Sequence, residues 1–256
     1  MNHLKVSLCI VCVMSIILMT GCSAMDRLTD NPALKKEIIK LVSNRVLNPK
    51  GTPGPRTVQP ANIFTDRMVL QRDAAIPLWG TAQPGEWVTA AIGKDYAVTQ
   101  ADSTGHWKLF LSKHKAGGPY KLVIRGDQGE PLILTDILIG DVFLCSGQSN
   151  MNMALQMCKG APEEIKKSNY PQIRLLRAWT QMNYGPYDRL DLKPAGSWQY
   201  CSSSTTPNFS GVAYYFGRDL HKAKNIPIGI IQSSVGGTAI ETWISRDSLL
   251  KTEPLR

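Results

Sequence analysis

One continuous apolar run restricts the fold of this chain more than any other feature. The run 137–145 reads "ILIGDVFLC", as expected for a strand inside a parallel sheet that is covered on both faces. It stops at "SGQS", and apolar residues with helical spacing begin directly afterwards, which predicts a helix over 150–159. Ser149 therefore lies at the corner between a buried strand and a helix.

The segments that follow continue the alternation of strand and helix. Strands are predicted over 172–179, "QIRLLRAW", and over 226–234, "IPIGIIQSS", with a helix over 210–225 between them. An apolar stripe on that helix is expected to face the sheet, and its members are Val212, Tyr215, Phe216 and Leu220. This alternation indicates an α/β fold with a parallel sheet over 137–256.

The preceding region, 61–136, has a different pattern. Short candidate strands are separated by Pro-Gly, Gly-Lys-Asp, Ser-Thr-Gly and Gly-Gly-Pro turns. In "HWKLFLS", Trp107, Leu109 and Leu111 fall on one face and Lys108 on the other, which is the period of a half-buried strand. Several such strands predict an all-β, sandwich-like domain. Such a domain can bind carbohydrate or support a neighbouring domain, and we expect the supporting role.

The N-terminus has the pattern of an export signal. Residues 1–21 place a basic residue before a short apolar run that ends at "LMTG", directly before Cys22. The run is too short to span a bilayer, which takes about 20 residues. Because "LMTGC" resembles a bacterial lipobox, we expect a cleaved lipoprotein signal peptide and a lipid anchor at Cys22. The chain would then be periplasmic or on the cell surface, anchored in the outer membrane, with residues 22–60 as a helix-containing, Pro- and Gly-rich tether.

Charge and cysteine spacing argue against two other classes of protein. The net charge of +9 is spread over short lysine clusters without interleaved aromatic residues. A nucleic-acid-binding protein would concentrate this charge on one face or motif, so no nucleic-acid partner is expected. Cys145, Cys158 and Cys201 lack the spacing of a metal site. Cys145 lies in the apolar strand and is interpreted as a small buried hydrophobe.

The serine corner suits nucleophilic chemistry. A serine at a strand-to-helix turn exposes its oxygen above the sheet edge, beside backbone N–H groups and the positive end of the helix dipole. Ligands in open α/β sheets bind outside the carboxyl ends of the strands, where the Gly236-Gly237 turn should also lie. Each feature alone is weak, because serine and paired glycines are common in ordinary turns and Asn150 is a plausible helix N-cap.

Longer motifs resemble those of a known enzyme family. "VFLCSGQSNM", "GSWQYCSS", "NFSGVAYYFGRDLH" and "GIIQSSVGGTAIETWIS", with "IFTDRMVLQRDAAIPLWGTAQPGE" and "GGPYKLVI" before them, resemble the sialate O-acetylesterases of the SGNH hydrolase group. The resemblance implies Ser149 as the nucleophile. It also implies an oxyanion hole made by the N–H of Ser149 and a glycine N–H, from Gly236 or its neighbour Gly237. Serine–histidine chemistry of this kind needs no metal or other cofactor.

The general base of that family has no counterpart here. SGNH hydrolases take it from a late Asp-x-x-His motif, whereas His106, His114 and His221 follow Ser103, Leu111 and Arg218 at the matching offset. The family's third block, with an oxyanion asparagine, is also missing. The resemblance thus predicts an incomplete, truncated SGNH domain over 137–256 that is marginally stable and nearly inert alone, since losing the serine or histidine of such a triad costs about 10⁶ in turnover.

The sequence leaves three interpretations of the function. The first is the N-terminal part of an exported sialate O-acetylesterase acting on O-acetylated sialic acid, completed in one version by a second polypeptide. The second is an acetylesterase of plant-polysaccharide acetyl groups. The third is a non-catalytic surface lipoprotein that binds glycans through its β-rich region, favoured by the absent histidine and opposed by the intact serine corner.

Overall fold

The computed structural model describes residues 54–178 and 197–251, which lie within one compact unit, Thr52–Arg256. The predicted signal peptide, the lipid anchor at Cys22 and most of the tether lie outside the described residues. Within the described part of the chain, no helix is long and apolar enough to cross a membrane.

A three-stranded antiparallel sheet is built from β1 (Gln59–Pro60), β3 (Ile76–Thr81) and β6 (His106–Leu111). As predicted, Trp107, Leu109 and Leu111 of β6 are buried and Lys108 is exposed. The buried face of this sheet joins the larger of two hydrophobic clusters, which also holds residues of β4, β7 and β8.

An eight-stranded sheet forms the rest of the β-structure. Its strands are β2 (Val69–Gln71), β4 (Trp87–Ile92), β5 (Asp95–Gln100), β7 (Gly117–Arg125), β8 (Leu132–Gly147), β9 (Tyr170–Arg177), β10 (Gln199–Cys201) and β11 (Ile228–Ser234). Their order is β10-β9-β11-β8-β7-β4-β5, with β2 also paired to β8. The helices are α4 (Ser149–Asn152), α5 (Ala161–Lys167), α6 (Gly211–Lys224) and α7 (Arg246–Leu249), with 3₁₀ turns η1 (Leu155–Met157) and η2 (Ile240–Trp243).

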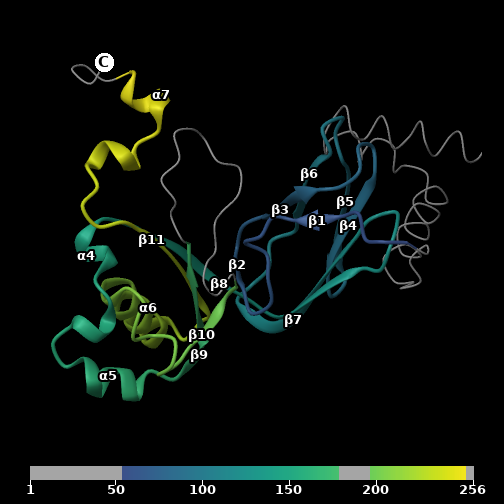
Figure 1. The fold of residues 1–256 in the computed structure, drawn as a ribbon. Helices are drawn as coiled ribbons and strands as arrows, with labels where there is room; N and C mark the ends of the chain where they lie inside the picture. The colour runs from purple at the N-terminus through teal and green to yellow at the C-terminus, as the bar shows by residue number, and fades with distance from the viewer. Residues whose placement is uncertain (1–53, 179–196, 252–256) are drawn as a thin grey trace, which may run out of the picture. The chain divides into compact units, whose positions relative to one another are not determined.

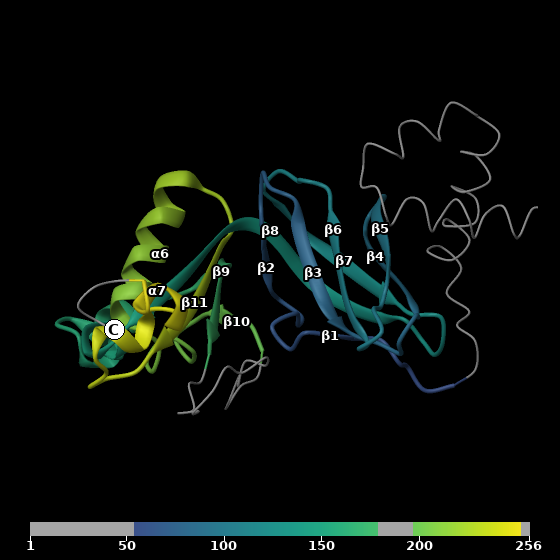
Figure 2. The same ribbon diagram turned by 90° about the horizontal axis from the view of Figure 1, so that it is seen from above.

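The long strand β8 belongs to both parts of this sheet (Figure 1). Its first half pairs with β7 in antiparallel fashion and with β2, up to Gly140. Its second half, 141–147, pairs in parallel register with β11, and β11 pairs in turn with β9. Figure 2 shows the same strand passing between the two groups of strands. The predicted boundary between the β-rich region and the α/β region, at 136/137, falls inside β8.

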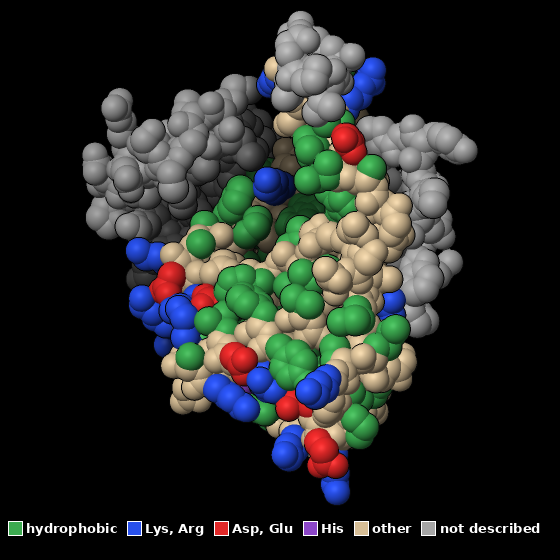
Figure 3. All heavy atoms as spheres, turned by 90° about the vertical axis from the view of Figure 1, so that its left-hand side faces the viewer, with side chains coloured by type: hydrophobic (Ala, Val, Ile, Leu, Met, Phe, Trp, Pro, Cys, Tyr) green, Lys and Arg blue, Asp and Glu red, His purple; other side chains and the backbone are tan. Residues whose placement is uncertain are grey.

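The helix α6 covers one face of the parallel strands. The side of α6 that packs on the sheet differs from the side predicted from the sequence. The predicted stripe is wrong for Val212 and Phe216, which are 45% and 44% exposed. The buried residues are instead Gly211, Ala213, Tyr214 and Gly217. The reason is close approach: a Cβ on Gly217 would lie 2.0 Å from Cδ1 of Ile230, so the side of α6 that carries Gly217 must face β11. The large Tyr214 is buried together with Gly217. Figure 3, seen from the α4–α6 side, shows hydrophobic side chains on this outer surface.

The opposite face of the second half of β8 differs from the expectation of a strand covered on both faces. Phe143 and Cys145 point to the cluster under α6, and burial raises the pKa of the Cys145 thiol. Leu144, on the other face, is 67% exposed in the described structure. Described residues therefore cover one face of this strand, whereas at Leu144 no described residues cover the other face.

An ion pair holds β8 where it changes partners. Arg72 donates to both carboxylate oxygens of Asp141, through Nε at 2.7 Å and Nη2 at 3.1 Å. The hydrogen bonds from Arg72 hold the pKa of Asp141 below its usual range. A carboxyl whose pKa is lower in the folded state stabilises the fold above its unfolded pKa of about 3.9, and loses that contribution as the pH falls through the folded pKa.

We therefore predict that Asp141→Asn lowers the free energy of unfolding at pH 7 by about 1 to 2 kcal/mol. The difference from the native protein should shrink as the pH falls from about 3.9 toward the lower folded pKa of Asp141, because the unfolded chain then binds a proton at Asp141 that the native state does not yet bind. Urea titrations at pH 7 and pH 3 measure this. Asp73→Asn is the control, since Asp73 also contacts Arg72 but is more exposed, and it should cost clearly less. An equal loss at both pH values would contradict the role of the charge.

Candidate active site

The corner at Ser149 is built by a glycine and a glutamine. Gly147 ends β8 with φ +142°, a conformation that residues with a side chain rarely adopt. Gln148 is the N-cap of α4, so the expectation that Asn150 caps the helix is wrong. Ser149, the first residue of α4, is exposed.

The predicted helix over 150–159 is also interrupted, and the cause is tertiary. α4 ends at Asn152, and the chain is then drawn into pairing with the segment before α6. The N–H of Leu155 donates to the carbonyl of Phe209, and the carbonyl of Met153 accepts from the N–H of Gly211. These backbone bonds replace the ones that a continuous helix would make.

The parallel pairing of β8 and β11 brings the second predicted feature to the serine. Ser234 of β11 is in register with Gly147, and the N–H of Val235 donates to the Gly147 carbonyl at 3.1 Å. The next residue is Gly236, where a Cβ would lie 3.9 Å from Oγ of Ser149. Gly237 adopts φ +78°, and a Cβ there would have no neighbour within 4 Å. The structure thus brings Ser149 and Gly236 together across the carboxyl edge of the sheet.

Gln148 controls the polar groups of Ser149 in this state. The side-chain oxygen of Gln148 accepts hydrogen bonds from the Ser149 N–H, at 2.8 Å, and from the Ser149 hydroxyl. The N–H expected to hold an oxyanion is therefore occupied by a neutral acceptor. An ester carbonyl that binds at this N–H has to displace the Gln148 side chain.

Asn152 is a site residue that the sequence reading missed. Its Nδ2 lies 3.9 Å from the position that a Cβ on Gly236 would take, as the Ser149 hydroxyl does. Ser234 donates from Oγ to Oδ1 of Asn152 at 3.3 Å, which leaves the amide N–H groups directed to this space. The spacing of Ser149 and Asn152, three residues apart on one helical turn, was the available signal.

A buried glutamine fixes this arrangement. Gln232, 1% exposed, donates from Nε2 to Oγ of Ser234 at 3.0 Å and accepts the N–H of Ser210 at 3.0 Å. Because Ser234 receives that hydrogen bond, its own proton is available for Asn152. The order Ser210, Gln232, Ser234, Asn152 therefore runs from the start of α6 to the serine corner.

The three histidines of the described chain have other partners. Nε2 of His114 lies 2.9 Å from Asp95, Nδ1 of His106 lies 2.8 Å from the Thr104 hydroxyl, and Nδ1 of His221 lies 2.7 Å from the Ile226 carbonyl. None of them bonds to Ser149 in the described structure, where the serine hydroxyl bonds to Gln148.

Other reactive groups do not gather at the corner. Among the described residues, no group of three or more His, Cys, Asp or Glu side chains could hold a metal ion. Cys145, Cys158 and Cys201 are free thiols. Burial raises the pKa of Cys201 to about 12, so this thiol stays protonated at neutral pH.

Comparisons with known proteins agree with the motifs. Residues 139–253 match the model of a carbohydrate esterase family, the sialic acid-specific acetylesterases. A mouse sialate O-acetylesterase is 32% identical in an alignment of 208 positions, which covers 74% of this chain and 38% of the mouse protein. The human sialate O-acetylesterase is 31% identical over the same length, covering 74% of this chain and 39% of that protein. The chain thus spans less than two fifths of these curated relatives.

A solved structure extends the likeness to the fold. A carbohydrate acetylesterase from Xanthomonas citri superposes with a TM-score of 0.70 at 33% sequence identity, covering 77% of this chain and 45% of that one. The mixed sheet with its helices therefore resembles a carbohydrate acetylesterase fold. The residues that carry the Ser149 corner and the Gly236 turn lie inside the matched region. Through residues 139–253, this chain is similar to the sialic acid-specific acetylesterases, a family of carbohydrate esterases.

Proposed function

We propose that Ser149 is the nucleophile of a carbohydrate O-acetylesterase. The observation that carries this is the approach of the Ser149 hydroxyl to Gly236, 3.9 Å from the place of its missing Cβ. A glycine there leaves room for an ester carbonyl between the hydroxyl and the turn. The N–H groups of Ser149 and of Gly236, with Gly237 as the alternative, would receive the negative charge that develops on the carbonyl oxygen.

The reaction follows the order of acyl transfer. The Ser149 oxygen attacks the acetyl carbonyl while a base removes its proton, and a tetrahedral oxyanion forms. Collapse of the oxyanion breaks the ester bond, and the base returns the proton to the sugar oxygen as the alcohol leaves. Water then attacks the acetyl-serine by the same route, releasing acetate and restoring the hydroxyl. Two ester bonds are broken and one is formed, at the expense of one water.

We infer that the base comes from outside the described residues, on a further segment or a second polypeptide. Two observations support this. The described histidines all bond elsewhere. In addition, the second half of β8 pairs with β11 on one side, and no described strand pairs with residues 141–147 on the other. A parallel strand added there would end beside Ser149, because parallel strands end at the same sheet edge. We refer to the chain combined with such a polypeptide as the completed enzyme.

We assign Asn152 as an additional oxyanion donor. In the completed enzyme, Asn152→Ala should lower kcat by about 10²-fold, the usual loss for one side-chain donor. Asn152→Asp should be at least as slow, because a carboxylate repels the oxyanion. Gln156→Ala is the matched control, since this exposed amide bonds to Asn208 and should keep kcat within about twofold. Acetate release from an aryl acetate gives the rates, and full activity of Asn152→Ala would remove this assignment.

The substrate that we propose is an O-acetylated sialic acid. Support comes from the matched family and from the names of the mouse and human relatives. Acetate release by the completed enzyme should be faster from O-acetylated sialic acid than from acetylated xylan, which represents plant polysaccharides. The opposite order would favour the polysaccharide reading and leave Ser149 as the nucleophile.

We also propose that the protein is exported and anchored through a lipid on Cys22. The support is the "LMTGC" sequence alone. Metabolic labelling with an alkyne fatty acid should mark the native protein, and Cys22→Ala should lose the label and leave the membrane fraction. A native protein without label would contradict the anchor.

A further inference from the structure

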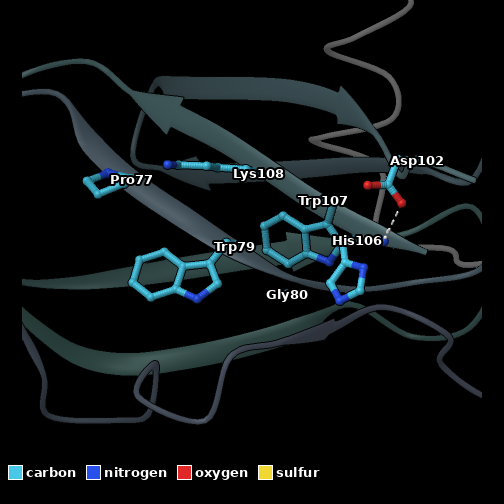
Figure 4. A pocket seen from close by; sticks show the side chains of 7 residues that line it. All are labelled: Pro77, Trp79, Gly80, Asp102, His106, Trp107 and Lys108. Atoms are coloured by element: carbon cyan, nitrogen blue, oxygen red, sulfur yellow. Dashed lines mark hydrogen bonds between the residues drawn. The ribbon is translucent and has the colours of Figure 1, made fainter. Parts of the chain in front are cut away.

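A hollow surface lies on the outward face of the three-stranded sheet, formed by β1, β3 and β6. Two adjoining hollows of about 520 and 650 Å³ share Trp79, Gly80 and His106 in their walls. Volumes of this size are typical of sites for small molecules and single sugar rings. Figure 4 shows Trp79 and His106 lining the hollow, with Lys108 alongside.

Trp79 is presented as a fixed, exposed platform. It is 41% exposed and lies on the same side of β3 as Pro77, which also lines the hollow. The buried ring of Phe64 packs edge-on against it, with ring centroids 4.7 Å apart. A ring held in this way loses little conformational entropy when a ligand stacks on it.

Polar groups stand beside the platform on the neighbouring strand. Lys108 is directly opposite Trp79 in the β3–β6 register, and His106 is opposite Thr81. Cross-strand partners on one face have their Cβ atoms about 5 Å apart, so both side chains border the tryptophan. Gly80 allows β1 to lie close to β3, because a Cβ on residue 80 would lie 2.1 Å from the Gln59 carbonyl oxygen.

Hydrogen bonds set the character of these groups. The Thr104 hydroxyl donates to Asp102 at 2.6 Å, so it accepts from Nδ1 of His106 at 2.8 Å, and Nε2 is the ring nitrogen that this bond leaves available. Asp102 also accepts the backbone N–H groups of His106 and Thr104. The bond from the Thr104 hydroxyl lowers the pKa of Asp102 most, and these two backbone bonds lower it further. The negative charge of Asp102 is thus compensated within its own turn. Lys108 is the lysine that lines the hollow, and its ammonium lies 5.2 Å from the centroid of the exposed Phe110 ring on the same strand.

We propose that this groove binds a sugar residue that carries a carboxylate, as a non-catalytic glycan site. The apolar face of the pyranose ring stacks on Trp79, the carboxylate pairs with Lys108, and a sugar hydroxyl donates to Nε2 of His106. The combination of an exposed aromatic face and one cation selects an acidic sugar over a neutral one. This site does not rest on the esterase reaction and operates without Ser149.

The test uses the full chain with Ser149→Ala and sialyllactose, which has no acetyl ester, beside lactose as the neutral control. Titration followed by the indole N–H signals in NMR should give tighter binding of sialyllactose than of lactose. Trp79→Ala should weaken the binding of sialyllactose by tenfold or more, as expected for an aromatic anchor. Lys108→Gln should weaken it by about three- to fivefold, the effect of one exposed ion pair, and leave lactose unchanged.

Lys108→Gln changes an exposed side chain, so it keeps the test valid if Trp79→Ala disturbs the fold. Equal affinity for the two sugars, no binding of sialyllactose, or an unchanged affinity after Lys108→Gln would each overturn the proposal. Esterase activity of the completed enzyme is measured separately on an aryl acetate. Absence of that esterase activity would contradict the role of Ser149 but not the glycan site. Absence of sialyllactose binding would contradict the glycan site but not the esterase proposal.

Discussion

Replacement of Ser149 by alanine will lower kcat for acetate release by about 10⁶-fold in the completed enzyme, because the serine and its base act as a unit. The 256-residue chain assayed alone should release acetate at the same low rate with serine or alanine at this position. No described histidine bonds to Ser149, and a serine without its base adds little to catalysis. Aryl acetate and O-acetylated sialic acid are the substrates to use.

A practical source of the completing polypeptide is the part of the Xanthomonas citri acetylesterase outside the aligned region, since this chain covers 45% of that protein. His221→Gln is the matched control, because Nδ1 of His221 bonds to the Ile226 carbonyl, and its kcat should stay within about twofold. A Ser149-dependent rate in the chain alone would show that a base already reaches the serine. If Ser149→Ala leaves kcat of the completed enzyme unchanged, Ser149 is not the nucleophile.

The second large effect concerns the strand that carries the serine. Gly140→Ala should lower the free energy of unfolding by about 3 kcal/mol, the upper end of an overpacking penalty. Gly140 is buried where β8 changes partners, and a Cβ there would lie 2.0 Å from the carbonyl oxygen of Pro227. Backbone cannot rotate aside as a side chain does, so β8 or the start of β11 has to move. The melting midpoint should fall by about 6 to 12 °C.

Gly236→Ala is the control for this effect. Its Cβ would meet no atom closer than 3.9 Å and its φ is not in the left-handed region, so its unfolding free energy should change by no more than about 0.5 kcal/mol. Urea and thermal unfolding of the three proteins decide the matter. If Gly140→Ala is as stable as the native protein, β8 and Pro227 do not approach each other as closely as described.

Some of the site was predictable from local sequence. The strand ending at the serine corner, the helix over 210–225 and the last strand over 226–234 correspond to β8, α6 and β11, because their hydrophobic periods and flanking glycines are local signals. The alternation in β6 was equally readable. The side of α6 that faces the sheet was not, since Val212 and Phe216 look like core residues. The helix turns its Gly217 side to the sheet because Gly217 must approach Ile230, and Tyr214 is buried with it.

By itself, the sequence determined the strand that ends at the serine, the helix α6, the glycine pair after a further strand, and the resemblance to a family of acetylesterases. Only the tertiary structure decided that Gly236 and Asn152 share one space with Ser149, and that Gln148 occupies the serine's N–H. The physical reason is that periodicity and turn residues act over a few neighbours along the chain. The register of β8 with β11 joins residues 87 positions apart, such as Ile228 and Asp141, and the hydrogen bond between Ser234 and Asn152 joins residues 82 positions apart.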